Sequence, residues 1–266
     1  MNGSTEGLSP AGTGTDAEVD SQAQMAARRQ ALEALSADRV PYVVAGAYAM
    51  REYTGIYRDT KDLDLFCKRS DCDRVLASLA RVGFRVERTD PLWLAKGFAA
   101  DGEFVDVIFS SGNGVAEVDD GWFARARQGT VLGMRAPLAP PEDIIWSKAY
   151  VMERERYDGA DVQHIVRACA PTLDWAYLLE RLRAHPEVLL AHLLLFRFSF
   201  PGDAAKVPEW VLDTLTDAVR LPPPVSYERV CRGTLLSAVQ YEPDLRAGLE
   251  DARPLEVSAW RTYRGH

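Results

Sequence analysis

The first half of the chain alternates short apolar runs with amphipathic stretches, and this pattern predicts a mixed α/β domain. Apolar side chains recur at helical spacing between Ala23 and Ala37, and again over Asp71–Val82 before Gly83, a common helix stop. We therefore expect a small mixed β-sheet flanked by helices. The expected strands, each a short apolar or alternating run, lie at 42–45, 62–67, 84–87, 92–98, 103–110 and 130–134.

The pattern of the second half predicts helices. A Pro-Pro pair at 140–141 begins a predicted helix that runs to about Arg154, and a second helix is expected at 158–169. Beyond Pro171 the pattern is almost wholly helical, including the stretch around Cys231. The second half is therefore expected to form a helical partner to the sheet.

These patterns divide the chain into three segments. Residues 1–22 are rich in Gly, Ser and Thr with little to bury, so we expect a disordered N-terminal tail. Residues 23–140 are expected to form the α/β domain, and residues 141–266 a helical C-terminal domain.

Composition and charge narrow the function classes. The 266 residues carry 31 Lys and Arg against 39 Asp and Glu, a net charge of −8, so bulk non-specific nucleic-acid binding is not expected. The four cysteines form no CxxC pair, which argues against a zinc site or a disulfide scaffold. The longest apolar run, 188–196, is about half a membrane span and contains His192, and no signal peptide is visible. We therefore expect a cytoplasmic protein with no membrane partner.

Acidic residues on two predicted strands form the main candidate site. Asp62 and Asp64 are separated by one residue in DLDLFC, so both side chains point to the same face. Two such carboxylates repel each other unless a cation lies between them, and oxygen ligands suit Mg²⁺. Asp106 alternates with valines on a later strand and would complete the cluster, with Asp101 and Glu103 as competing candidates. Three carboxylates suffice for two Mg²⁺ ions, one to activate a hydroxyl nucleophile and one to steady a triphosphate.

A glycine ahead of these acids suits a phosphate site. Gly46 lies between a predicted strand and a predicted helix. There, backbone N–H groups and the helix N-terminus can meet phosphate oxygens without a side chain in the way. Strand–glycine–helix turns are common, and this one gains weight because Asp62 and Asp64 follow on the next strand.

The order of these residues resembles the nucleotidyltransferase superfamily related to DNA polymerase β. That family is marked by a Gly followed by Gly or Ser, then a D-x-D pair, then a distant third carboxylate. The matching residues here are Gly46, Asp62, Asp64 and Asp106. The segment PEDIIWSKAYVMERERYDGAD at 141–161 is similar to the helical segment of the AbiEii-type branch. The resemblance covers about residues 40–165 and implies a nucleotidyltransferase-like fold.

The resemblance implies roles for the residues around the sheet. Gly46 and Ala47 would hold phosphates, and Asp62, Asp64 and Asp106 would ligate Mg²⁺. Ala47 departs from the family pattern, because a phosphate-contacting hydroxyl is missing while the backbone N–H remains.

The resemblance also implies roles in the helical segment. A helix lysine completes the nucleotide site in that family, so Lys148 would bind the nucleotide and pair with its triphosphate. Asp158 or Asp161 would act near the nucleotide or the acceptor hydroxyl, and Asp161, one turn inside its predicted helix, is the preferred catalytic candidate. The residue pattern alone also allows Lys148 as a surface lysine and Asp158 as a helix cap. Arg156 is expected to be solvated.

The sequence therefore predicts a Mg²⁺-dependent nucleotidyltransferase that moves a nucleoside monophosphate from an NTP to an acceptor hydroxyl or phosphate. The alternative is a catalytically inactive nucleotide-binding or interaction protein on the same fold, which Ala47 allows. The AbiEii-type resemblance implies a toxin–antitoxin-like enzyme acting on tRNA, whereas the acidic composition suits a cationic small-molecule acceptor such as an aminoglycoside. Basic runs at 81–88 and 125–135 do not decide between these acceptors.

Overall fold

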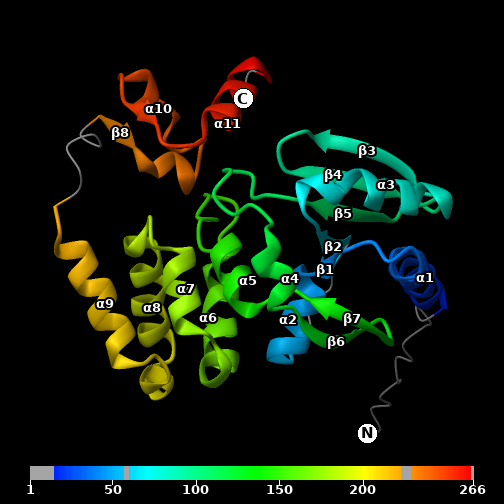
Figure 1. Ribbon diagram of the computed structural model, residues 1–266, viewed down its shortest axis with the longest axis horizontal. Coiled ribbons are helices and arrows are strands. Elements are labelled where there is room, and N and C mark those ends of the chain that lie inside the picture. Colours follow the sequence, from blue (N-terminus) through cyan, green and yellow to red (C-terminus); the bar gives the residue numbers. More distant parts are fainter. Residues whose placement is uncertain (1–14, 57–59, 61, 223–228, 265–266) are drawn as a thin grey trace, which may run out of the picture.

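The computed structural model describes residues 15–56, 60, 62–222 and 229–264. A β-sheet with its own helices lies beside a stack of further helices, and the C-terminal residues form a small layer above that stack (Figure 1). The expected fold class, a mixed sheet flanked by helices, is confirmed.

The main sheet is mixed. Within the described residues it is seven-stranded, in the order β3-β4-β5-β2-β1-β7-β6. Strand β2 runs parallel to β5, β1 runs parallel to β7, and the remaining neighbours are antiparallel. The strands are β1 (Val43–Val44), β2 (Asp62–Phe66), β3 (Arg85–Asp90), β4 (Leu94–Phe98), β5 (Phe104–Ile108), β6 (Arg127–Val131) and β7 (Met134–Leu138). The central pair β2 and β5 therefore presents its side chains in matched rows.

Helices pack on this sheet at two places. Helices α1 and α3 pack on each other and on strands β3, β4 and β5, whereas α2 contacts β2, β6 and helix α6. Because α2 touches both the sheet and the helix stack, it joins the two parts of the molecule. The helices of this part are α1 (Thr15–Ala37), α2 (Gly46–Thr54), α3 (Cys72–Arg81), α4 (Asp120–Ala124) and the 3-10 helix η1 (Arg69–Asp71).

The helix stack continues from α5 to α9. Helix α5 packs on α6 and α7, α6 packs on α8, and α8 packs on α9, so neighbours in the stack follow the chain closely (Figure 1). Its members are α5 (Pro141–Lys148), α6 (Gly159–Cys169), α7 (Trp175–Arg181), α8 (Pro186–Ser199) and α9 (Glu209–Arg220), with the 3-10 helices η2 (Ala170–Thr172) and η3 (Pro201–Lys206).

Residues 229–264, here called the C-terminal segment, depart from the helical expectation. Cys231 lies on a strand rather than a helix, because β8 and β9 pair in parallel within this segment. Two-residue strands are too short to show an alternating pattern, which is why the sequence did not reveal them. The elements are β8 (Val230–Cys231), η5 (Arg232–Leu235), α10 (Glu242–Arg246), β9 (Glu250–Asp251) and α11 (Leu255–Arg264).

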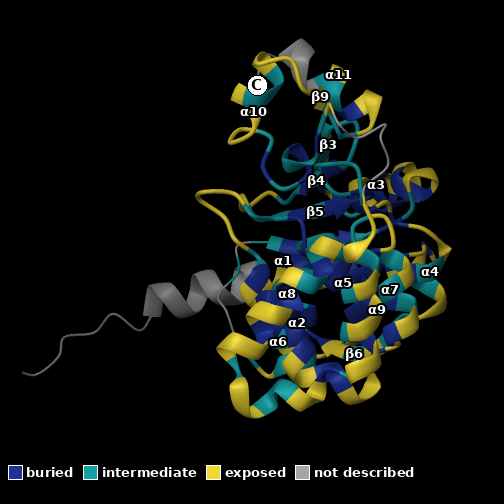
Figure 2. Ribbon diagram, turned by 90° about the vertical axis from the view of Figure 1, so that its left-hand side faces the viewer, coloured by how far each residue is buried: buried dark blue, intermediate teal, exposed yellow. Residues whose placement is uncertain are grey.

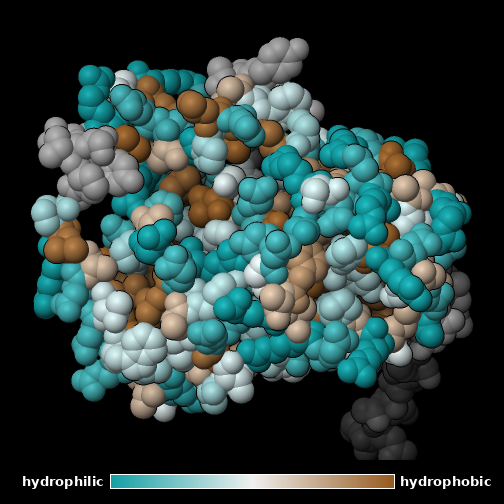
Figure 3. Space-filling model, in the orientation of Figure 1, coloured by the Kyte–Doolittle hydropathy of each residue, from teal (hydrophilic) through white to brown (hydrophobic). Residues whose placement is uncertain are grey.

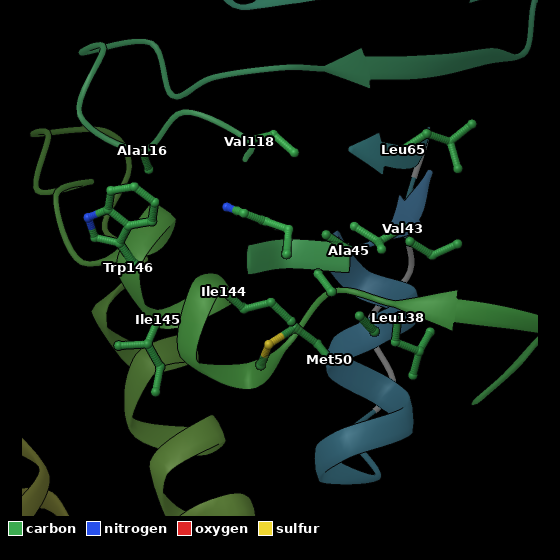
Figure 4. Packing of buried hydrophobic residues seen from close by; sticks show 14 of the residues in the cluster. Val43, Ala45, Met50, Leu65, Ala116, Val118, Leu138, Ile144, Ile145 and Trp146 are labelled. Atoms are coloured by element: carbon green, nitrogen blue, oxygen red, sulfur yellow. The ribbon is translucent and has the colours of Figure 1, made fainter. Parts of the chain in front are cut away.

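One buried apolar cluster joins the sheet to the helix stack (Figure 2). Ile144 and Ile145 of α5 are 2% and 0% exposed and lie near Leu138 of β7 and Met50 of α2 (Figure 4). Burying each isoleucine side chain contributes about 1.5–3 kcal/mol. Helix α5 is therefore fixed against the sheet, and Lys148 at its end has a defined place relative to β2.

Two helix boundaries differ from the sequence prediction. Helix α1 begins at Thr15 rather than Ala23, so only residues 1–14 of the expected tail remain, and these lie outside the described residues. Helix α5 ends at Lys148 rather than near Arg154, since the chain turns back in a bridge between Met152 and Tyr157.

No helix in the described part of the chain has the length and apolar character that crossing a bilayer requires. The division into separate domains at residue 140 stays a prediction.

Candidate active site

Strands β2 and β5 bring the three predicted aspartates together. In their parallel register Asp64 lies opposite Asp106, and Asp62 lies two residues earlier on the same face of β2. One oxygen from each carboxylate can be chosen so that all lie within 4.8 Å of one another. We call these three residues the carboxylate cluster.

The two competing acids have other roles. Glu103 forms an ion pair with Arg28 at 2.9 Å. Asp101 accepts a hydrogen bond from the backbone N–H of Glu103 at 3.0 Å in a turn. The geometry therefore favours Asp106 as the third member of the cluster.

The carboxylate cluster holds uncompensated negative charge. Burial and the nearby charges of Asp62 and Asp106 together raise the pKa of Asp64 to about 7, although Lys148 and Arg156 act in the opposite direction. Burial also raises the pKa of Asp106, although Lys96, directly across on β4, donates to its Oδ1 at 2.6 Å. The Thr60 hydroxyl donates to Asp62 Oδ1 at 2.7 Å. Among the residues that the structure describes, one lysine is ion-paired with these three carboxylates, which leaves a site suited to a cation.

Gly46 lies where no larger residue fits. It begins helix α2 with φ +57°, and the backbone N–H of Ala45 before it donates to the Asp64 carbonyl at 3.0 Å. A Cβ at this position would lie 1.7 Å from Asp64 Oδ2. The glycine therefore allows both the left-handed backbone and the close approach of the Asp64 carboxylate. Ala47 follows in the first turn, where backbone N–H groups have no partner within the helix.

Lys148 lies at the centre of a second group of charged residues in the site. Its Nζ lies 2.9 Å from Asp158 Oδ2 and 2.9 Å from Asp161 Oδ2, and Arg156 pairs with Asp158 at 3.1 Å. Burial lowers the pKa of Lys148, but the two carboxylates outweigh it and raise the pKa. Burial likewise opposes the charge of Asp158, yet Lys148 and Arg156 hold its pKa below the usual value. We call these four residues the lysine cluster.

A cavity of about 380 Å³ connects the two clusters. Gly46 and Asp64 line it from the sheet, and Lys148 and Asp158 line it from the helix stack, whereas Asp161 is not among its lining residues. Arg156, expected to be solvated only, also lines it. On the face seen in Figure 3, hydrophobic residues gather where the C-terminal segment meets the helix stack.

Three further lining residues were missed at the sequence level. Trp93, Asn113 and Arg253 lie far apart in the chain and meet only in the fold. Trp93 and Asn113 stand in connections beside strands, and Arg253 follows β9, so none belongs to a periodic pattern. The only signal available was the unusual VCRGTLLSAVQY stretch, part of which forms the cavity wall next to Arg253.

Comparisons with known proteins find likeness in structure only. No family model and no curated protein matches the chain. It is similar to the antibiotic-resistance factor ANT(2″)-Ia, with a TM-score of 0.45 and 19% identity over 67% of this chain and 98% of the other. It is also similar to the lincosamide antibiotic adenylyltransferase LnuA, with a TM-score of 0.39 and 14% identity over 53% and 94% of the two chains.

A nucleotidyltransferase-like protein from Paracoccidioides brasiliensis matches with a TM-score of 0.40 and 17% identity, over 72% of this chain and 94% of that one. Each of these three matches has a TM-score below 0.5.

Proposed function

We propose that the protein is a nucleotidyltransferase, which moves a nucleoside monophosphate from an NTP to an acceptor and releases pyrophosphate. The observation that supports this most is the carboxylate cluster beside Gly46. Asp62, Asp64 and Asp106 offer oxygen ligands within 4.8 Å of one another, at the start of a helix whose backbone N–H groups suit phosphate.

The carboxylate cluster fits Mg²⁺ by its chemistry. Its donors are all carboxylate oxygens, the ligands that hard divalent cations prefer. The raised pKa of Asp64, about 7, reflects burial and the repulsion of its neighbours, which a bound cation relieves. When bound, Mg²⁺ supplies activation of the acceptor hydroxyl and neutralisation of the triphosphate charge. We propose Asp62, Asp64 and Asp106 as its ligands.

The chain's own groups would bind and orient the triphosphate. Gly46 and Ala47 present backbone N–H groups at the N-terminus of α2. An ammonium group has three donors, and Asp158 and Asp161 use two of those of Lys148. The third can reach a phosphate oxygen in the cavity that Lys148 lines.

The two aspartates of the lysine cluster take different roles. Asp158 lines the cavity and can meet the nucleotide or the acceptor hydroxyl, so we propose it as the site residue. Asp161 contacts Lys148 without being among the lining residues, so we propose it as a positioning residue. This reverses the preference that the sequence suggested.

A small-molecule acceptor is supported better than tRNA. Arginines of the basic run at 81–88 are paired with acids, because Arg81 contacts Asp38 and Arg88 contacts Asp73. Arg127 of the second run lies 3.6 Å from Glu142. Phosphate backbones require clusters of basic side chains that are available to bind them. We therefore propose a small molecule with a hydroxyl group as the acceptor.

A nucleotide-binding protein without turnover is the second candidate function. Two observations favour it. Ala47 removes a phosphate-contacting hydroxyl, and Lys96 already occupies one oxygen of Asp106.

Binding and turnover separate these two functions. The thermal shift of the protein is measured with each NTP, with and without Mg²⁺, beside the Asp62→Ala/Asp64→Ala variant. An NTP at 100 times its dissociation constant should add about 2.7 kcal/mol, which is a readable shift. Mg²⁺-dependent stabilisation that the variant loses supports the site. No shift with any NTP would contradict both functions.

Turnover is then followed as pyrophosphate release in the presence of acceptors. Release with pooled small polyols or aminoglycosides supports the transferase and its small acceptor. Incorporation of label from an α-phosphate-labelled NTP into tRNA alone would overturn the acceptor assignment. Binding without release under either condition would support the second candidate.

A further inference from the structure

The C-terminal segment forms one wall of the cavity. Leu235 and Leu236 line it, and Arg253 lines it from just beyond β9. The segment is attached to the loop after β5, because Asn113 Nδ2 donates to the Leu235 carbonyl at 2.7 Å. This wall is therefore fixed relative to the sheet that carries the carboxylate cluster.

Arg253 is buried in this wall with one nitrogen unsatisfied. Its side chain is 8% exposed, and its Nε and Nη2 bond to the Asp251 carboxylate at 2.9 and 2.6 Å. Its Nη1 is buried and has no hydrogen-bond partner. A buried guanidinium N–H without an acceptor is costly, so such groups usually await a ligand or water. Asp251 fixes the orientation of the side chain and leaves Nη1 available.

Arg253 lies at the end of the cavity that is away from the carboxylate cluster. Along the parallel strands β2 and β5 the cavity runs from Asp64 past Phe66 and Ile108. It continues to the loop at 110–113, which bonds to the C-terminal segment beside Arg253. If the phosphates bind near Asp64, as proposed, the nucleoside end of the same ligand would extend along the cavity toward Arg253.

This far end has the character of a base-binding pocket. Phe66, Trp93, Leu235 and Leu236 supply aromatic and aliphatic surface, against which a planar base can pack. The cavity of about 380 Å³ is near the lower end of the range for small-ligand sites, roughly 300–1,000 Å³, so it suits one nucleotide.

We propose that Arg253 is a specificity-determining residue whose Nη1 donates to an exocyclic carbonyl oxygen of the nucleotide base. This rests on the proposed function. Guanine, uracil and cytosine each carry at least one exocyclic carbonyl oxygen, whereas the exocyclic group of adenine is an amino group and adenine presents no carbonyl. The site therefore selects GTP, UTP or CTP over ATP.

The experiment measures the affinity of the wild-type protein and of Arg253→Met for the four NTPs and for tripolyphosphate, by calorimetry with Mg²⁺ and no acceptor. Methionine keeps the apolar stem and removes the donors. We expect about a tenfold loss of affinity for the preferred carbonyl-bearing NTP. Affinity for ATP and for tripolyphosphate should change by less than about threefold, since neither uses Nη1.

Arg232→Met is the matched control. Arg232 also belongs to the C-terminal segment and contacts Glu187 and the Ala184 carbonyl, but it does not line the cavity. It should leave every affinity unchanged. If Arg253→Met unfolds the segment by stranding Asp251, the double variant Asp251→Asn/Arg253→Met removes the pair together and serves in its place.

Several outcomes would overturn the inference. One is a wild-type protein that binds ATP more tightly than the other NTPs. Another is an Arg253→Met variant that loses affinity equally for all NTPs and for tripolyphosphate, which would indicate a phosphate contact or a structural role. Equal losses in Arg232→Met would also point to structure alone. Binding of no NTP to the wild-type protein would instead refute the proposed function, and this inference with it.

Discussion

The two charged clusters of the site contain the same types of residue, but they differ in the ratio of basic to acidic side chains. In the lysine cluster, Lys148 bonds to Asp158 and Asp161 and Arg156 adds a second cation, so each buried charge has a partner. In the carboxylate cluster, the described residues provide one ion-paired lysine, Lys96, against three acids. A buried charge is tolerated when it is paired, and an unpaired one is costly unless a ligand compensates it. The first cluster is thus complete within the protein, and the second calls for a cation.

The largest expected effect follows from removing the cation ligands. Asp62→Ala and Asp64→Ala should each lower kcat/KM by at least about 10³-fold, which is about 4 kcal/mol of transition-state stabilisation, because the cation loses a ligand. Pyrophosphate release measures this, and circular dichroism checks the fold. Asp101→Asn, a change in the exposed turn, is the matched control and should keep full turnover. Unchanged turnover in either alanine variant would contradict the assignment.

The next largest effect concerns the lysine cluster. Lys148→Met should lower the free energy of unfolding by about 3 kcal/mol, because it leaves Asp158 and Asp161 largely buried without their shared cation. Chemical denaturation measures the loss, and added Mg²⁺ should not restore it.

Lys96→Met sharpens the same comparison. It should also destabilise the protein, since it leaves Asp106 unpaired, but here Mg²⁺ should restore much of the loss by taking the place of the lysine. An identical response of both variants to Mg²⁺ would break the distinction between the clusters.

Gly46→Ala should lower the free energy of unfolding by about 1–2 kcal/mol through the left-handed backbone alone. It should also abolish turnover, because the new Cβ displaces the Asp64 carboxylate. Gly55→Ala is the matched control. Gly55 also has a positive φ, +72°, but nothing lies within 4 Å of a Cβ there. It should lose only the backbone cost of about 1–2 kcal/mol, measured by denaturation, and keep normal turnover. Retained activity in Gly46→Ala would show that Asp64 is not needed where it lies.

The smallest effect is a gain in stability. Folding raises the pKa of Asp64 from 3.8 to about 7, so the folded protein holds this proton more tightly than the unfolded chain. The wild-type free energy of unfolding therefore falls as pH rises through this window. Asp64→Asn removes the titration, so without metal it should be more stable than wild type at pH 8.

Denaturation curves in a chelating buffer measure this difference. It should shrink toward zero below about pH 3, where Asp64 is protonated in both the folded and the unfolded state. If the difference in the free energy of unfolding does not change with pH, the pKa of Asp64 is not raised in the folded protein.

The sequence predicted what local patterns can encode. Alternation on a strand placed Asp62 and Asp64 on one face, and the order of glycine, acid pair and distant acid indicated that Asp106 would join them. The pairing of Lys96 with Asp106 was not predicted, because it depends on the register of β4 against β5. Arg253 reaches the cavity through contacts between distant segments, which no local period reveals. The proposed preference for Asp158 over Asp161 rests on the lining of the cavity, which no local pattern reveals.

The close approach of Gly46 and Asp64 has a consequence for how this site can change by mutation. The Asp64 carboxylate occupies the space that a side chain at position 46 would need, so a larger residue at one position and a carboxylate at the other exclude each other. A chain that has acquired alanine at position 46 can relieve the clash by shortening residue 64, and it then loses the cation ligand as well. Selection for variants that restore the fold of Gly46→Ala should thus yield proteins that lack Asp64. Such proteins need two reversions, at positions 46 and 64, before activity returns.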